Sequence, residues 1–371
     1  MSRIFLLFGA FALVASACSG DTATTTTTSS STTTTSTPPT TTPSTTTTST
    51  MPASTTTTIY VEGTTVTTNP PGFSSPVNGL PAEEEIKLDR RAIGVKIDNR
   101  PEGRPQSGVM DADSVIELRV EGGYTRFLAI FHDNDSEYLG PVRSVRPTDS
   151  TVLAAIGAPL AMSGGQPWVQ AVHTSRGVGL IGPGAANLFR ISSRVAPFNL
   201  YGNTADMRAG ADSLEFDNDP PTSLYPIVEW EFPEAIAHQI VLDWSDTVTV
   251  TWDWDGEVYR RTHNGEDHVV VDQKGNLERI TAEVLVVLGA EFYTQFPPPS
   301  DSDWQAVPAL DTAGSGRAWV FARGRIWQGT WQRAQYADEF KLLNSDGTQT
   351  GVPAGFSWVS IFPDHRSVDW S

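Results

Sequence analysis

Residues 94–149 read GVKIDNRPEGRPQSGVMDADSVIELRVEGGYTRFLAIFHDNDSEYLGPVRSVRPTD. Apolar residues alternate here with charged ones, as they do in β-strands that have one face packed on the core. The clearest pattern runs from Val115 to Ile130, where two strand-like segments flank Gly122-Gly123. A pair of glycines between such segments is a two-residue hairpin turn signal. We therefore expect a β-hairpin at the centre of the first folded domain.

The hairpin is expected to have one polar and one apolar face. With the two glycines as the loop, Glu117 lies opposite Leu128 and Arg119 lies opposite Arg126. Strict side-chain alternation then separates the faces. The polar face carries Glu117, Arg119, Glu121, Tyr124 and Arg126. This face is either a cross-strand charge lattice or the wall of a ligand site.

A second charged segment follows the hairpin. Arg143 and Arg146 precede Thr148 and Asp149, either of which can cap a helix over 150–157. Guanidinium groups beside a helix N-terminus favour an anion, although the arginines can equally pair with nearby carboxylates. The candidate ligand site or polar cluster comprises Asp98, Arg104, Glu117, Glu121, Arg126, Arg143 and Arg146. All of these except Glu117 are expected to converge at the edge of the first domain's sheet.

The chain has 371 residues, and its pattern divides into four parts. Residues 1–17 are a signal peptide and 18–82 a disordered stalk. Residues 83–226 form an α/β (α+β) domain with a mixed sheet and helices, because strand and helix patterns alternate there. Residues 227–371 form a mainly β domain, because strand patterns and turns follow one another. A Pro- and Asp-rich segment over 217–226 marks the boundary between the two folded domains.

The N-terminus predicts a lipid anchor. Arg3 precedes an apolar run that is too short to span a bilayer, and Cys18, the only cysteine, follows Ala15-Ser16-Ala17. We expect cleavage before Cys18, lipidation of Cys18, and an extracytoplasmic, membrane-anchored protein; the alternative is an ordinary secretory signal. The Thr/Ser/Pro-rich stalk has too little apolar content to fold and reaches about 200 Å when fully extended.

Several function classes fit the sequence poorly. A net charge of −18 disfavours nucleic-acid binding. Glu117 and Glu121 stand about 13 Å apart on a regular strand, too far for a glycosidase pair. Gly177 to Gly182 match G-x-G-x-x-G, but Pro183 and Gly184 interrupt the helix that a dinucleotide site needs. No metal or cofactor site is expected, and no catalytic residue is identified.

Several segments resemble the YerB-like family of bacterial lipoproteins, a two-domain family of unknown function. They include Ile97-Asp98-Asn99 and Gly324 to Trp331. Others are RPQSG (104–108), VEGGYTRF (120–127), GPVRSVRP (140–147), NLY (199–201) and GFSWV (355–359). The resemblance covers residues 83–364. It implies surface anchoring and an α/β first domain followed by a β-rich second one, and it implies no particular activity.

We therefore expect a membrane-anchored module of the cell envelope, without enzymatic activity. Its partners would be the membrane, through the lipid on Cys18, and an anionic cell-wall polymer or a wall-synthesis protein. The alternative is a hydrolase of wall glycan or peptide that uses carboxylate and arginine side chains.

Overall fold

A computed structural model describes residues 58–61, 64–67, 73–231 and 233–371. The predicted signal peptide, Cys18 and most of the predicted stalk lie outside these residues. Within the stalk, β1 (Thr58–Val61) pairs with β2 (Thr64–Thr67). Among the described residues, no helix is long and apolar enough to cross a membrane.

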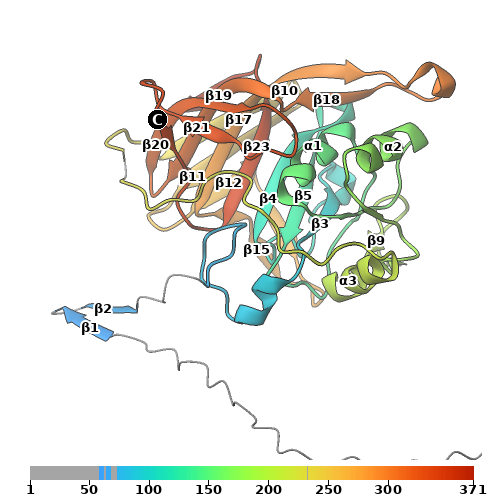
Figure 1. The fold of residues 1–371 in the computed structure, drawn as a ribbon, viewed down its shortest axis with the longest axis horizontal. Coiled ribbons are helices and arrows are strands. Elements are labelled where there is room, and N and C mark those ends of the chain that lie inside the picture. Colours follow the sequence, from blue (N-terminus) through green and yellow to red (C-terminus); the bar gives the residue numbers. More distant parts are fainter. Residues whose placement is uncertain (1–57, 62–63, 68–72, 232) are drawn as a thin grey trace, which may run out of the picture. The chain divides into compact units, whose positions relative to one another are not determined.

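One twelve-stranded sheet runs through both predicted domains (Figure 1). Its strands follow the order β22-β21-β20-β19-β17-β23-β4-β5-β3-β6-β7, and β18 pairs with β17. The two halves meet where β23 runs parallel to β4. The first half contributes β3 (Ile93–Asp98), β4 (Ser114–Arg119), β5 (Thr125–Phe131), β6 (Leu160–Ala161) and β7 (Leu180–Ile181). The second contributes β17 (Val284–Gln295), β18 (Val307–Asp311), β19 (Gly314–Ala322), β20 (Arg325–Arg333), β21 (Lys341–Leu343), β22 (Gln349–Thr350) and β23 (Ser357–Pro363).

A second, antiparallel sheet covers one face of the first. Trp252 of this sheet packs against Trp358 of β23, which in turn contacts Phe127 of β5. Buried aromatic pairs of this kind contribute about 0.5–1.5 kcal/mol beyond the burial of their apolar surface, so they stabilise the packing of the two sheets. The second sheet comprises β10 (Gln239–Ser245), β11 (Val248–Trp254), β12 (Tyr259–His263), β13 (Glu266–Asp267), β16 (Thr281–Ala282) and β24 (Val368–Trp370). Two further pairs are β8 (Phe189–Arg190) with β9 (Leu200–Tyr201), and β14 (Val269–Val271) with β15 (Leu277–Arg279).

Helices pack against β3, β7 and β18 of the large sheet. Helix α1 (Pro147–Ile156) begins at a proline that suits the first helical turn and ends at Gly157, whose φ is +77°. Leu153 of α1 lies so close to β3 that a Cβ at Gly94 would stand 2.9 Å from it. The other helices are α2 (Pro167–Ser175) and α3 (Thr204–Ser213). Short 3-10 turns occur at η1 (Glu85–Asp89), η2 (Pro101–Gly103), η3 (Glu121–Gly123) and η4 (Pro299–Asp301).

The predicted hairpin exists, but its predicted register is wrong by one residue. The loop is the three-residue turn η3, closed by Val120 N donating to Tyr124 O at 2.8 Å, with Gly122 and Gly123 both at positive φ. Glu117 therefore lies opposite Phe127, and Leu118 opposite Arg126. A one-residue slip turns every β5 side chain to the other face. Glu117 and Arg126 consequently lie on opposite faces, and both faces are covered.

The predicted fold class is confirmed: a mixed sheet with three helices lies in the first region, and the second is mainly antiparallel β. The boundary at residues 226 and 227 stays a prediction, since strands from both sides share one sheet. Ordered structure starts before Glu83. Val77 is buried, and Asn78 Nδ2 donates to Asp113 O at 3.3 Å, so residues 73–82 pack on the core.

Candidate functional site

Five of the seven candidate residues lie together near the ends of β3 and β5. We call Asp98, Glu121, Arg126, Arg143 and Arg146 the arginine cluster. Arg143 Nε lies 2.6 Å from Asp98 Oδ2, at an angle that does not suit a hydrogen bond, so charge holds this pair. Arg146 donates two hydrogen bonds, of 2.7 and 2.8 Å, to the carboxylate of Glu121. Asp98 and Arg126 face each other across the strands.

The extended segment before α1 brings the two later arginines to the cluster. Arg143 N donates to Lys96 O at 2.8 Å, and Asp98 N donates to Pro141 O at 2.9 Å, so this segment runs along β3. Arg126 Nη1 donates to Ser144 O at 2.7 Å. The alternation of Pro, Val, Arg and Ser over 141–146 thus supplies both backbone acceptors and guanidinium groups.

The arginine cluster carries more positive than negative charge. Its three guanidiniums face two carboxylates, and Arg126 Nε is buried without a hydrogen-bond partner among the described residues. Burial, and then the charge of Arg146, lower the pKa of Arg126 to about 9. Burial alone would raise the pKa of Glu121, but the hydrogen bond and charge of Arg146 outweigh it and lower that pKa. An added anion would relieve this excess.

A fully buried ion pair lies beside the cluster. Lys96 Nζ is 2.5 Å from Asp149 Oδ1, and neither side chain is exposed. Burial lowers the pKa of Lys96, partly offset by the charge of Asp149. Asp149 Oδ2 also accepts a 2.7 Å hydrogen bond from Arg146 N at the start of α1. The chain's own carboxylate therefore occupies the helix N-terminus, which removes that part of the predicted anion site.

Glu117 does not join the arginine cluster; it lies on the opposite face of the hairpin, fully buried. Its Oε1 accepts from Arg261 Nη2 at 2.8 Å and from Thr125 Oγ1 at 2.6 Å, and its Oε2 accepts from Trp358 Nε1 at 2.9 Å. Arg119, its expected neighbour in a charge lattice, instead stacks on the ring of Phe292. Glu117 thus joins the two halves of the chain.

A closed ring of hydrogen bonds runs through this site. Arg261 Nε donates to His268 Nδ1, and His268 Nε2 contacts Gln106 Oε1 at 3.1 Å. Gln106 Nε2 donates to Asn99 Oδ1, whose Nδ2 donates to Thr125 Oγ1. We call Glu117, Arg261, His268, Gln106, Asn99 and Thr125 the Glu117 ring. Because every member is buried, the ring fixes how the two sheets pack.

Arg104, the last candidate residue, lies apart from the arginine cluster as well. It lines a pocket of about 420 Å³ between the segment around η2 and the turn from β12 to β13. We call this the histidine pocket. Its walls are formed by Pro101, Arg104, Pro105, His263, Asn264, Glu266, Asp267, His268 and Val269. The one-residue change in hairpin register cannot account for Arg104, which reaches the pocket because η2 turns the chain away from β3.

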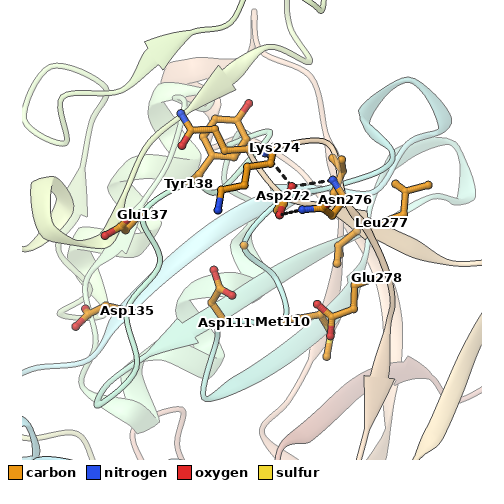
Figure 2. A pocket seen from close by; sticks show the side chains of 14 residues that line it. Met110, Asp111, Asp135, Glu137, Tyr138, Asp272, Lys274, Asn276, Leu277 and Glu278 are labelled. Atoms are coloured by element: carbon orange, nitrogen blue, oxygen red, sulfur yellow. Dashed lines mark hydrogen bonds between the residues drawn. The ribbon is translucent and has the colours of Figure 1, made fainter.

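An acidic pocket of about 440 Å³ is a feature that sequence reasoning missed (Figure 2). The hairpin β14–β15 forms one wall, and the loops around Asp111 and Glu137 form the other. Asp135 is already paired with Arg90 and Arg208, and Asp111 accepts from Ser136 Oγ at 2.6 Å. Among the described residues, no group of three or more His, Cys, Asp or Glu side chains is placed to hold a metal.

Asp113 holds a buried carboxyl next to Asp133. Its Oδ2 accepts from His132 N at 2.6 Å, while Asp133 Oδ1 is buried without a partner among the described residues. Burial, and then the hydrogen bond and charge of Asp133, raise the pKa of Asp113 to about 8. The folded protein therefore holds a proton on Asp113 at pH values where a free carboxyl has lost it.

Because Asp113 is protonated in the folded state, we expect the free energy of unfolding to fall as pH rises. The folded pKa of Asp113 lies above the unfolded value, so the folded state keeps a proton that the unfolded state loses between about pH 4 and pH 8. The free energy of unfolding should decrease through this range, by at most about 1.4 kcal/mol per pH unit. Urea unfolding at several pH values should show a flatter profile for Asp113→Asn than for Asp111→Asn, an exposed control. Equal slopes in both variants would contradict the assignment.

Comparisons with known proteins match most of the folded region. One family model, described as "Protein of unknown function (DUF3048) N-terminal domain", matches residues 77–217, and the corresponding "C-terminal domain" model matches residues 240–359. A Bacillus subtilis (strain 168) relative named "Putative lipoprotein YerB" is 24% identical over 303 residues, which span 79% of this chain and 87% of the relative. The crystal structure of the Bacillus subtilis YerB protein has a TM-score of 0.66 at 22% identity, covering 80% of this chain and 100% of that one. The fold is therefore shared.

Proposed function

This chain belongs to the DUF3048 family of proteins of unknown function, and on that premise we propose that it is an extracytoplasmic lipoprotein that binds an anionic cell-wall polymer. The name of the Bacillus subtilis relative and the position of Cys18 after an apolar segment support a lipid anchor. A Thr/Ser/Pro-rich stalk would carry the folded region away from the membrane and into the wall.

The observation that carries the proposal is the excess positive charge of the arginine cluster. A chain of net charge −18 repels polyanions over most of its surface, so binding needs a local basic site. Arg143 and Arg146 keep 12% and 15% of their side chains exposed, and guanidinium groups bind carboxylates and phosphates well. The alternative of a wall hydrolase gains no support from Glu117, whose carboxylate is buried and held by Arg261.

Arg146 is the best residue for a test. Its partner Glu121 is 37% exposed, so water can solvate the carboxylate that Arg146→Ala leaves behind. We expect a stability change of about 0–1 kcal/mol and at least an approximately tenfold loss of affinity for purified anionic wall polymer. The measurement is retention of the full chain, in detergent, on isolated wall, together with urea unfolding. Arg143 is less suitable, because its partner Asp98 is fully buried.

Arg260→Ala is the matched control. Arg260 is a half-exposed arginine on β12 that pairs with Asp255 at 2.5 Å, so its loss changes the net charge equally. Retention should be unchanged in this variant. Equal losses in the two variants would mean that only net charge matters, and unchanged retention in Arg146→Ala would remove the arginine cluster from the proposal.

A further inference from the structure

The histidine pocket contains buried hydrogen-bonding groups that the protein itself does not satisfy. His263 is 3% exposed and lines the pocket, yet neither ring nitrogen has a partner among the described residues. Arg104 Nε, in the same pocket, is likewise buried and unpartnered. Buried polar atoms nearly always have hydrogen-bond partners. These unpartnered atoms in one pocket therefore indicate that the pocket binds a ligand.

In the neighbouring His268, by contrast, both ring nitrogens have hydrogen-bond partners. Its two ring nitrogens contact Arg261 at 3.0 Å and Gln106 at 3.1 Å. Its ring meets that of His263 edge to face, with centroids 5.5 Å apart. His268 therefore belongs to the Glu117 ring, whereas His263 is turned to the pocket and contributes nothing to that ring.

The charges around the pocket favour an anion. Arg261, which lies behind the histidines, is offset by Glu117, but its Nη1 is buried and unpartnered in the part of the chain described. Arg104 adds a positive charge for which no described carboxylate lies within ion-pair distance. Burial, and then the charges of Arg261 and Arg104, lower the pKa of His263 to about 3. A cation would meet the same two guanidiniums, so a metal ion is disfavoured.

We propose that the histidine pocket binds one compact anionic group, a carboxylate or a phosphate, held by Arg104 and His263 in front of Arg261. The site is separate from the arginine cluster, which lies on the other face of β5. Charge-assisted hydrogen bonds from guanidinium to an anion are among the stronger ones in proteins. An anion here would accept hydrogen bonds from Arg104 Nε and from the one N–H of the neutral His263 ring.

The rim of the pocket limits what can enter. Glu266 and Asp267 are exposed carboxylates in its wall, and Asp267 forms an ion pair with Arg279. These carboxylates would repel a highly charged polymer that lay across the opening. The pocket therefore suits a small ligand or the single charged end of a larger one, and a pocket of about 420 Å³ is large enough for either.

Histidine NMR of the full chain tests this proposal. The protein has six histidines, so labelled imidazole resonances can be assigned by single substitutions. Sodium acetate and inorganic phosphate are titrated separately, against sodium chloride at matched ionic strength. We expect a saturable shift of the His263 resonance, with a Kd of about 1 mM or tighter, from at least one of the two anions. A response to acetate alone identifies a carboxylate site, and a response to phosphate alone a phosphate site.

Two variants decide whether the shift reports this pocket. Arg104→Ala should weaken binding at least tenfold while the other histidine resonances stay in place. Arg260→Ala, on the same strand as His263, should bind as the wild type does. No saturable shift with either anion, or an equal effect of the two variants, would overturn the proposal. Arg146→Ala should leave this titration unchanged, so the site and the proposed wall binding can fail separately.

Discussion

Glu117→Ala is expected to lower the free energy of unfolding by about 3–5 kcal/mol, the loss typical of removing one partner of a buried ion pair. Arg261 is fully buried and lies over the rings of Trp252 and Trp358. Without Glu117 its charge has no compensating carboxylate, and Trp358 Nε1 loses its acceptor. Urea unfolding of the full chain measures the change.

A double variant separates the ion pair from the rest of the Glu117 ring. Glu117→Gln keeps one acceptor oxygen, which can serve Trp358 or Thr125, and Arg261→Met removes the opposing charge. Because the partners interact directly, the double variant should lose less stability than the two single variants together. Glu257→Ala, at an exposed turn, serves as control and should change stability by less than about 0.5 kcal/mol. Strict additivity would mean that Glu117 and Arg261 do not stabilise each other.

Lys96→Met should cost about 3–5 kcal/mol for the same reason on the other face of the sheet. It leaves Asp149 charged and fully buried, with the Arg146 N–H as its remaining donor. Asp149→Asn keeps a side-chain oxygen for that donor and removes the charge. The double variant should therefore recover part of the loss in urea unfolding. A Lys96→Met protein as stable as wild type would mean that the Lys96–Asp149 pair does not stabilise the fold.

The sequence predicted the elements better than their partners. Helix α1 begins within one turn of the predicted segment 150–157 and ends inside it, since Pro147 and Gly157 mark its ends. The glycine pair predicted the hairpin correctly. The sequence does not distinguish a two-residue loop from a three-residue loop, because that difference depends on the hydrogen bond between Val120 N and Tyr124 O. That single ambiguity placed Glu117 and Arg126 on one face when they occupy two.

The candidate site was predictable where its residues are close in sequence. Asp98, Glu121, Arg126, Arg143 and Arg146 sit on adjacent strands and the segment beside them. The partner of Glu117 is Arg261, 144 positions further along the chain. Arg261 lies in a strand of alternating polarity, where the pattern does not indicate a buried arginine. His263 gave no signal either, because a lone histidine in a strand carries no information about whether its nitrogens are satisfied.

The most direct test of wall binding is photo-crosslinking in living cells from position 163. Ser163 N donates to Arg143 O at 3.0 Å, so a photoreactive residue there lies beside the arginine cluster. The control position is Lys274, on the exposed turn between β14 and β15. We predict a wall-polymer adduct from position 163 that is absent from position 274 and lost in Arg146→Ala. A protein adduct alone, or equal polymer labelling from both positions, would contradict the proposal.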